Sequence, residues 1–307
     1  EDILKEFEQS FYTFGNYSTV ILLSLYVPTF IIALLGNILI ILTVLADETL
    51  RKTKNFYLIN LASSDLCITL VCMPMTVGTI VYRLWIYGEF LCKFTAFLPG
   101  VAVASSIFTL TAMSIDRYVS IQRPSRPHWV TSPGQAVCII ISTWIVSGIL
   151  MGPLLYIRQV DTLPLPNKAP MRFCIEKWPK DDDRQAFGIF LLFVVYVIPS
   201  VTLALCYGHV GKALCTNQML RNTSDSSNER LSSRKKAAKI LIVMVLVFMV
   251  CWLPYNIISL SIDITQGSGP IDALPFSLWL GHAHSAINPV MYWSLNRRFR
   301  ERVQGLM

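Results

Sequence analysis

The stretch Lys239–Tyr255 has the sequence KILIVMVLVFMVCWLPY and carries no charged side chain after its first residue. The mainly apolar stretch continues to Ile264, with Asp263 as a charged residue near its end. About 20 apolar residues in a helix cross the roughly 30 Å hydrocarbon core of a bilayer. The stretch therefore predicts a membrane-spanning helix over Ile240–Ile264.

The whole chain shares this character. Of its 307 residues 53% are hydrophobic and 15% charged, against about 25% charged in a soluble protein. This composition excludes a disordered chain and leaves too little polar surface to cover one soluble domain. The predicted spans are Val20–Leu45, Phe56–Tyr82, Leu91–Ile121, Ala136–Ile157, Phe187–Leu214, Ile240–Ile264 and Ile271–Leu295.

We therefore predict an all-α fold, an integral membrane bundle of seven transmembrane helices. Residues 1–19 are expected to form an extracellular N-terminal arm and residues 20–295 the transmembrane domain. Residues 296–307 are expected to form a short amphipathic helix and a truncated tail. Two spans contain polar residues, which are costly in lipid and therefore usually face a bundle interior. These residues are Ser105, Ser106, Asp116, His282, His284 and Asn288.

The distribution of charge sets the orientation. A net charge of +7 could indicate nucleic acid as a partner, but the basic residues lie at particular ends of the spans, so no nucleic-acid partner is expected. Most follow the first, third and fifth spans or lie in the tail, and basic loops stay cytoplasmic. We predict a multi-pass plasma-membrane protein with an extracellular N-terminus, a cytoplasmic loop 215–239 and an extracellular loop 158–186. Asn16 then lies in an outer glycosylation sequon.

Two of the eight cysteines, Cys92 and Cys174, fall on the predicted outer side. An outer pair in an oxidising compartment predicts a disulfide. The alternative is two unpaired thiols. The cysteine and histidine spacings contain no pattern that indicates a metal site.

Polar and aromatic motifs occur in order, each in its own span. They are Gly36-Asn37, Asn60–Asp65, Asp116-Arg117-Tyr118, Trp144, Pro199 with Tyr207, Cys251–Pro254 and Asn288–Tyr292. In this set the chain resembles the rhodopsin-like (class A) G-protein-coupled receptors over nearly its whole length. Trp85–Gly88 and Cys174–Pro179 are similar to the receptors for neuropeptide FF, orexin and prolactin-releasing peptide.

The resemblance implies a sodium ion as an allosteric ligand, and no other cofactor is expected. Its ligands would be Asp65, Ser106, Ser285 and Asn288, oxygen-bearing side chains that suit a hard cation. The alternative is a protonated Asp65 that is hydrogen-bonded to the same neighbours. His284 stands where many members of the family have asparagine.

The resemblance also implies an activation switch. Asp116 would hold Arg117 until the sixth helix opens, and Arg117 would then contact a Gα subunit. Many relatives carry a second acid at the base of the sixth helix, whereas this chain has Arg234, with Ala238 one turn on. We therefore predict appreciable basal signalling. The other switch residues are Tyr118, Pro199, Ile107, Phe248, Trp252, Pro254, Tyr207, Pro289 and Tyr292; plain core packing is the alternative for Phe248 and Trp252.

The outer half of the bundle indicates the class of ligand. Pro99 stands where amine receptors carry an aspartate, and Ile271–Leu295 lacks the lysine that binds retinal. The resemblance to receptors for peptides ending in Arg-Phe-amide or Arg-Tyr-amide implies that Asp263 pairs with a ligand arginine. Glu176 could supply a further anion, although acids in outer loops are often only solvated. The remaining candidate pocket residues are Thr76, Thr79, Pro99, Val103, Tyr255, Asn256, Ser259, Leu278 and His282.

The leading hypothesis is a neuropeptide receptor that activates heterotrimeric G proteins and is not an enzyme. Membrane lipid is the third expected partner, since Phe299 among Arg297, Arg298 and Arg300 predicts a helix on the inner leaflet. The alternatives are an orphan receptor with ligand-independent signalling or a heteromer role, a lipid receptor, and a transporter or channel. A transporter would require a continuous polar path, and the spans contain few charges.

Overall fold

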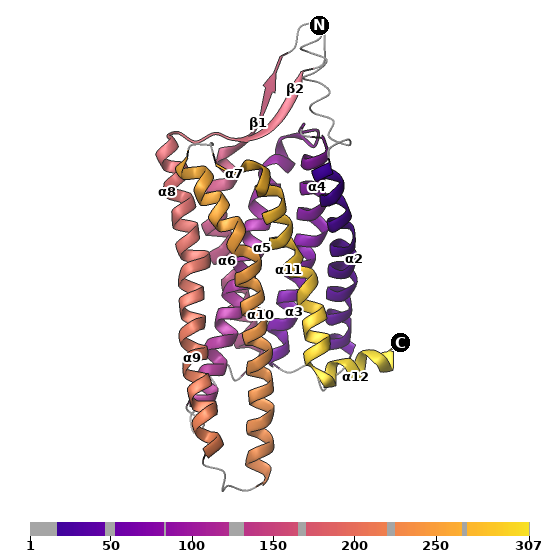
Figure 1. Ribbon diagram of the computed structural model, residues 1–307, viewed down its shortest axis with the longest axis vertical. Coiled ribbons are helices and arrows are strands. Elements are labelled where there is room, and N and C mark those ends of the chain that lie inside the picture. The colour runs from indigo at the N-terminus through magenta and orange to yellow at the C-terminus, as the bar shows by residue number, and fades with distance from the viewer. Residues whose placement is uncertain are drawn as a thin grey trace.

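The computed structural model describes residues 17–46, 53–82, 84–122, 132–164, 170–219, 225–265 and 269–306. Long helices lie side by side, a hairpin stands at one end, and α12 (Arg297–Leu306) lies across the other (Figure 1). The bundle consists of α2 (Tyr17–Ala46), α3 (Thr53–Cys67) with η2 (Ile68–Cys72) and α4 (Met73–Tyr82), α5 (Gly88–Gln122), α6 (Pro133–Met151) with α7 (Pro153–Ile157), α8 (Asp181–Leu191) with η3 (Leu192–Val197) and α9 (Ile198–Met219), α10 (Asp225–Ile264), and η4 (Ile271–Ala273) with α11 (Leu274–Leu295).

Six helical segments in the described part of the chain are long and apolar enough to cross a membrane. The seventh helix, α11, is less apolar because it carries several polar side chains. These side chains are buried within the bundle, among them Ser277, His282, His284, Ser285 and Asn288. Helix α11 packs against both α10 and α2 and so closes the bundle. The predicted all-α bundle of seven membrane helices is confirmed.

Several helices extend beyond the apolar stretches that predicted them. Helix α9 ends at Met219 and α10 begins at Asp225, so most of the loop expected at 215–239 is helical. Helix α8 begins at Asp181, inside the loop expected at 158–186, and α2 begins at Tyr17, inside the expected arm 1–19. Hydropathy marks the part of a helix that lies in lipid, whereas backbone hydrogen bonding continues into polar sequence.

The segment between α7 and α8 contains a two-stranded antiparallel hairpin, which the prediction of an all-α fold did not include. Strand β1 (Arg158–Leu163) pairs with β2 (Met171–Glu176), with Val160 opposite Cys174. Cys174 forms a disulfide with Cys92 at the start of α5, with a Cα–Cα distance of 5.5 Å. The backbone N–H of Val160 also donates to Glu89 over 2.9 Å. The predicted disulfide is confirmed, and together with this hydrogen bond it holds the hairpin against α5.

The main core cluster lies where α3, α5, α9 and α10 meet. Its fully or nearly buried members are Leu61, Ile107, Leu110, Leu203, Leu241, Met244, Val245, Phe248 and Trp252. At another contact, Gly36 of α2 lies so close to α11 that an added Cβ would be 2.6 Å from the Cγ of Pro289. Close packing therefore holds α3, α5, α9 and α10 together at the core, and it also holds α2 against α11.

Candidate functional site

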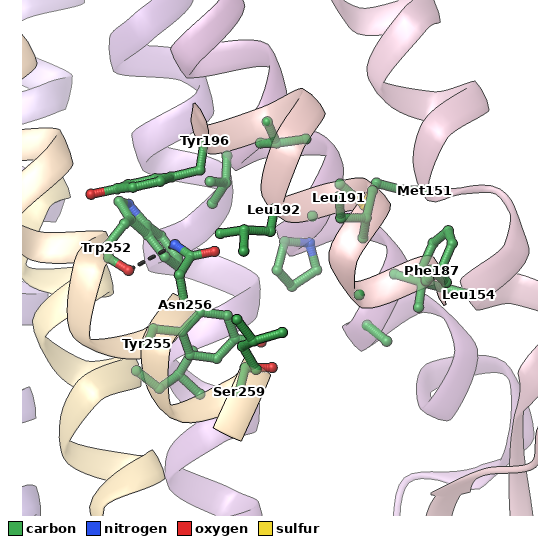
Figure 2. A pocket seen from close by; sticks show the side chains of 18 of the residues that line it. Met151, Leu154, Phe187, Leu191, Leu192, Tyr196, Trp252, Tyr255, Asn256 and Ser259 are labelled. Atoms are coloured by element: carbon green, nitrogen blue, oxygen red, sulfur yellow. Dashed lines mark hydrogen bonds between the residues drawn. The ribbon is translucent and has the colours of Figure 1, made fainter. Parts of the chain in front are cut away.

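A cavity of about 390 Å³ lies between the helices near the hairpin end of the bundle. In Figure 2, Trp252, Tyr255, Asn256 and Ser259 of α10 lie on one side of it. An apolar wall from α6, α7, α8 and η3 lies on the other. The labelled residues of that wall are Met151, Leu154, Phe187, Leu191 and Leu192, whereas Tyr196 of η3 lies beside Trp252. The Tyr196 hydroxyl donates to the Met249 carbonyl of α10 over 2.9 Å.

The cavity brings together nearly all of the predicted ligand-binding residues. Thr76 comes from α4, Pro99 and Val103 from α5, and Glu176 from β2. The other predicted residues that line it are Tyr255, Asn256, Ser259, Asp263, Leu278 and His282. Thr79 does not line the cavity; it lies near the outer end of α4, is exposed, and its hydroxyl donates to the Thr76 carbonyl over 2.9 Å.

The sequence reasoning missed the basic and apolar residues that come from the outer loop and from α8. Arg158 and Arg184 line the cavity, and so do Trp178 and Phe187. In the sequence, both arginines are among several basic residues in the loop expected at 158–186. No sequence signal distinguishes a loop arginine whose side chain points into a pocket from one whose side chain points into solvent.

The two acids at the mouth of the cavity are paired with arginines. Arg184 Nε lies 3.0 Å from Asp263 Oδ1 and 3.8 Å from Glu176 Oε2. Arg158 Nη2 donates to Glu176 Oε1 over 2.7 Å, and Trp178 Nε1 donates to Glu176 Oε2 over 3.1 Å. Arg158 Nε is buried without a hydrogen-bond partner among the described residues. The mouth is thus a cluster of balanced charge with one spare donor.

The floor of the cavity is aromatic and continuous with the core. Trp252 packs against Phe248 and Tyr255, with ring centroids 6.2 and 5.8 Å apart. The Asn256 side-chain amide donates to the Trp252 carbonyl over 2.8 Å (Figure 2). His282 Nδ1 lies 3.2 Å from the hydroxyl of Tyr26 on α2. Since Phe248 and Trp252 also belong to the core cluster, a ligand on this floor would press directly on the core.

A second polar cluster lies deeper, around the fully buried Asp65 of α3. Ser285 Oγ donates to Asp65 Oδ1, and Asn288 Nδ2 donates to Asp65 Oδ2, each over 2.8 Å. His284 Nε2 lies 2.9 Å from Asn288 Nδ2, and its Nδ1 lies 3.8 Å from Asp65. Ser106 Oγ is buried and has no hydrogen-bond partner within the described ranges. Two of the predicted sodium ligands, Ser285 and Asn288, therefore bind the third, Asp65, and the fourth, Ser106, has a buried hydroxyl without a partner in the described part of the chain.

The predicted switch residues are distributed over several helices of the bundle. Ile107 and Phe248 lie in the core cluster, Pro254 lies inside α10, and Pro289 lies inside α11. Pro199 is the second residue of α9, directly after the π-helical turn η3; proline lacks the N–H that continues an α-helix.

Tyr207 on α9 lies with its hydroxyl 2.7 Å from Ser114 Oγ of α5. The ring of Tyr292 meets Phe299 of α12 at a centroid distance of 4.9 Å. Asp116 is buried near the inner end of α5, and Tyr118 lies half-buried two residues further on.

Some of the predicted site residues lie outside the part of the chain that the structure describes. Asn16 precedes the first described residue. The side chains of Arg117, Arg234 and Ala238 belong to helical positions at which only the backbone is described.

The fold, the cross-linked outer hairpin and the ordered polar motifs define a family of membrane receptors. Residues 36–292 match the family of seven-transmembrane receptors of the rhodopsin type. The chain belongs to this family, and it is a multi-pass plasma-membrane receptor and not an enzyme.

Among its relatives are receptors named for peptides. The chain is 33% identical over 92% of its length to a QRFP-like peptide receptor of Branchiostoma floridae, covering 76% of that protein. It is 30% identical over 90% of its length to the RYamide receptor of Tribolium castaneum, covering 77% of it. It is 28% identical over 93% of its length to the substance-P receptor of Mus musculus, covering 70% of it.

Proposed function

We propose that this receptor binds a neuropeptide that carries an arginine near an amidated C-terminus and transmits binding to a heterotrimeric G protein. The observation that carries the proposal is the pair of carboxylates, Glu176 and Asp263, at the mouth of a cavity with an aromatic floor. A guanidinium suits a carboxylate because it forms charge-assisted, often bidentate hydrogen bonds. Relatives named for QRFP-like and RYamide peptides support the same class of ligand.

The cavity has room and chemistry for the two C-terminal residues of such a peptide. The arginine would lie at the acidic mouth, and the aromatic ring would lie between the α10 side chains and the apolar wall of α8. Since a peptide amide is uncharged, its C-terminus needs no further cation.

Signalling would follow from the contact between the cavity floor and the core. A ligand that displaces Trp252 shifts Phe248, which packs within the core cluster. Pro254 interrupts the backbone hydrogen bonding of α10 and provides a hinge, so the inner half of α10 can swing outward. The ligand acts only by binding the open arrangement more tightly than the closed one.

Sodium would act as an allosteric ion at Asp65. The unused Ser106 hydroxyl and the Asp65 carboxylate fit an oxygen-preferring cation, and Ser285 and Asn288 hold the carboxylate in place. A bound sodium ion would neutralise the buried carboxylate. The neutral alternative keeps a proton on Asp65 within the same hydrogen bonds.

The same proposal places the N-terminus and Asn16 outside the cell and α12 on the inner leaflet. Phe299 and Val303 of α12 are buried against the helical bundle. Arg300 lies over the Trp293 ring at 5.8 Å from its centroid. The remaining basic residues of α12 would meet lipid phosphates.

The test is a panel of Gα subunits activated by a library of amidated peptides in cells that express the receptor. Peptides ending in Arg-Phe-amide or Arg-Tyr-amide are expected to activate it. Asp263→Ala should lower their potency roughly ten- to hundred-fold, because a hydrogen bond to a charged group contributes about 1.5–3 kcal/mol. The matched control is Asp272→Ala, since Asp272 is exposed in η4. Equal losses for both variants would contradict the proposal.

A further inference from the structure

Asp263, the proposed acceptor for the ligand arginine, is already bound by an arginine of the receptor itself. Arg184 Nε lies 3.0 Å from Asp263 Oδ1. The Asp263 side chain is only 10% exposed, whereas that of Arg184 is 46% exposed. The largely buried carboxylate of Asp263 is therefore paired with the side chain of Arg184, which is about half exposed to solvent.

The shape of α8 leaves room for one guanidinium at this acid. Gly188 lies one helical turn after Arg184, and an added Cβ there would be 2.7 Å from Asp263 Oδ2. The Oδ2 atom thus lies against the backbone of α8, and Arg184 occupies the Oδ1 side. Two guanidinium groups cannot reach so restricted a carboxylate together.

On the basis of the peptide-binding function proposed above, we propose that Arg184 is a specificity-determining residue that competes with the ligand's arginine for Asp263. In the receptor without ligand, Arg184 neutralises the acid. A peptide guanidinium takes its place when the ligand binds. Arg184 then moves toward Glu176, whose Oε2 is 3.8 Å from Arg184 Nε.

The neighbouring charges make this exchange feasible. Glu176 is held by Arg158 and Trp178, so it stays in place as a second acceptor while Arg184 moves. The exchange replaces one guanidinium on Asp263 by another, so the nearly buried acid never loses its partner. An unpaired charge in that position would be costly.

The competition also predicts which ligands are rejected. A neutral side chain cannot displace Arg184, because the acid would lose its charged partner. A lysine ammonium is a compact and strongly hydrated charge without the planar fork of a guanidinium, so it is a poorer replacement. Discrimination thus comes from a cost imposed on the wrong group as well as from attraction to the right one.

The experiment measures dissociation constants on the full chain in lipid nanodiscs with two synthetic hexapeptide amides. One ends in Arg-Phe-amide, and the other has citrulline, the neutral analogue of arginine, in place of that arginine. We expect Arg184→Gln to bind the arginine peptide roughly tenfold more tightly, which corresponds to about 1.4 kcal/mol. Its affinity for the citrulline peptide should stay the same. Arg184→Lys, which keeps the charge, should show a smaller gain.

Two further variants complete the design. Arg172→Gln is the matched control, because Arg172 is exposed on β2 and lies away from the cavity lining; its affinities should equal those of the unsubstituted receptor. The double variant Arg184→Gln/Asp263→Asn should bind both peptides equally, because the gain depends on Asp263.

The possible outcomes separate a failure of the competition from a failure of the peptide-binding function. If the unsubstituted receptor prefers the arginine peptide but Arg184→Gln and Arg184→Lys show no gain, the competition is overturned and the peptide function stands. If neither the unsubstituted receptor nor Arg184→Gln prefers the arginine peptide, the pairing at Asp263 is wrong and both proposals fail. A preference that emerges only in Arg184→Gln supports the competition.

Discussion

Asp65 and Asp263 are acids of the same bundle that are held in opposite ways. Asp65 is surrounded by Ser285, Asn288 and His284, none of which carries a permanent charge. Asp263 faces the permanently charged Arg184. The first acid therefore still requires a cation or a proton, whereas the second already has its counter-ion.

The proposed sodium site yields a prediction about stability. Thermal unfolding of the purified receptor should occur at a higher temperature in sodium chloride than in N-methylglucamine chloride. Sodium at ten times its dissociation constant would add about 1.4 kcal/mol. Asp65→Asn should abolish the difference, and Asp272→Asn should keep it. An unfolding temperature of the unsubstituted receptor that does not respond to sodium would disprove the site.

A second residue-scale prediction concerns basal signalling. Arg234 stands at the base of the sixth helix, where many relatives of the class carry an acid that pairs with the counterpart of Arg117. We expect second-messenger output without ligand, and we expect Arg234→Glu to reduce it several-fold by supplying the missing ion pair. Lys235→Glu changes the neighbouring charge and is the control. Output equal to that of cells with an empty vector would refute the prediction.

At the scale of elements, the bundle depends on close helix contacts that hydropathy does not reveal. Helices α2 and α11 approach at Gly36 and Pro289, where no space remains for a Cβ. Helix α6, in contrast, has many exposed side chains, and an added Cβ at Gly148 would meet nothing within 4 Å. One glycine is thus required by packing, and the other is not.

This contrast predicts opposite effects of the same substitution. Alanine favours a helix by about 1 kcal/mol over glycine. Gly148→Ala should therefore leave the unfolding temperature unchanged or raise it slightly. Gly36→Ala should lower it, because overpacking costs about 1–3 kcal/mol. Thermal unfolding of both purified variants tests this, and an increase for Gly36→Ala would show that the contact is loose.

For the whole molecule, seven crossings require that the two ends of the chain lie on opposite sides of the membrane. An epitope tag before Glu1 should bind antibody on intact cells, and a tag after Met307 should bind it only after permeabilisation. Both tags on one face would contradict the bundle. A tag inserted after Gln122, at the end of α5, should behave like the C-terminal tag.

The architecture and most of the pocket could be predicted from the sequence, because spans and motifs are local patterns. Asp65, Trp252 and Asn288 each lie within such a pattern. The pairing of Arg184 with Asp263 could not be predicted, because it depends on how α8 turns toward α10. The hairpin was missed because Arg158–Leu163 and Met171–Glu176 are short and mixed in polarity, and their pairing follows from the tertiary position of Cys174.

Glu176 lies two residues after Cys174 on β2, so the covalent cross-link to Cys92 also fixes where this carboxylate can reach. If Glu176 binds the ligand as proposed, charge recognition would therefore depend on whether the surroundings oxidise or reduce this disulfide. A mild extracellular reductant that opens the disulfide would leave Glu176 less firmly positioned. The receptor would then discriminate less well between peptides with basic and with neutral side chains, while the helical bundle stayed folded.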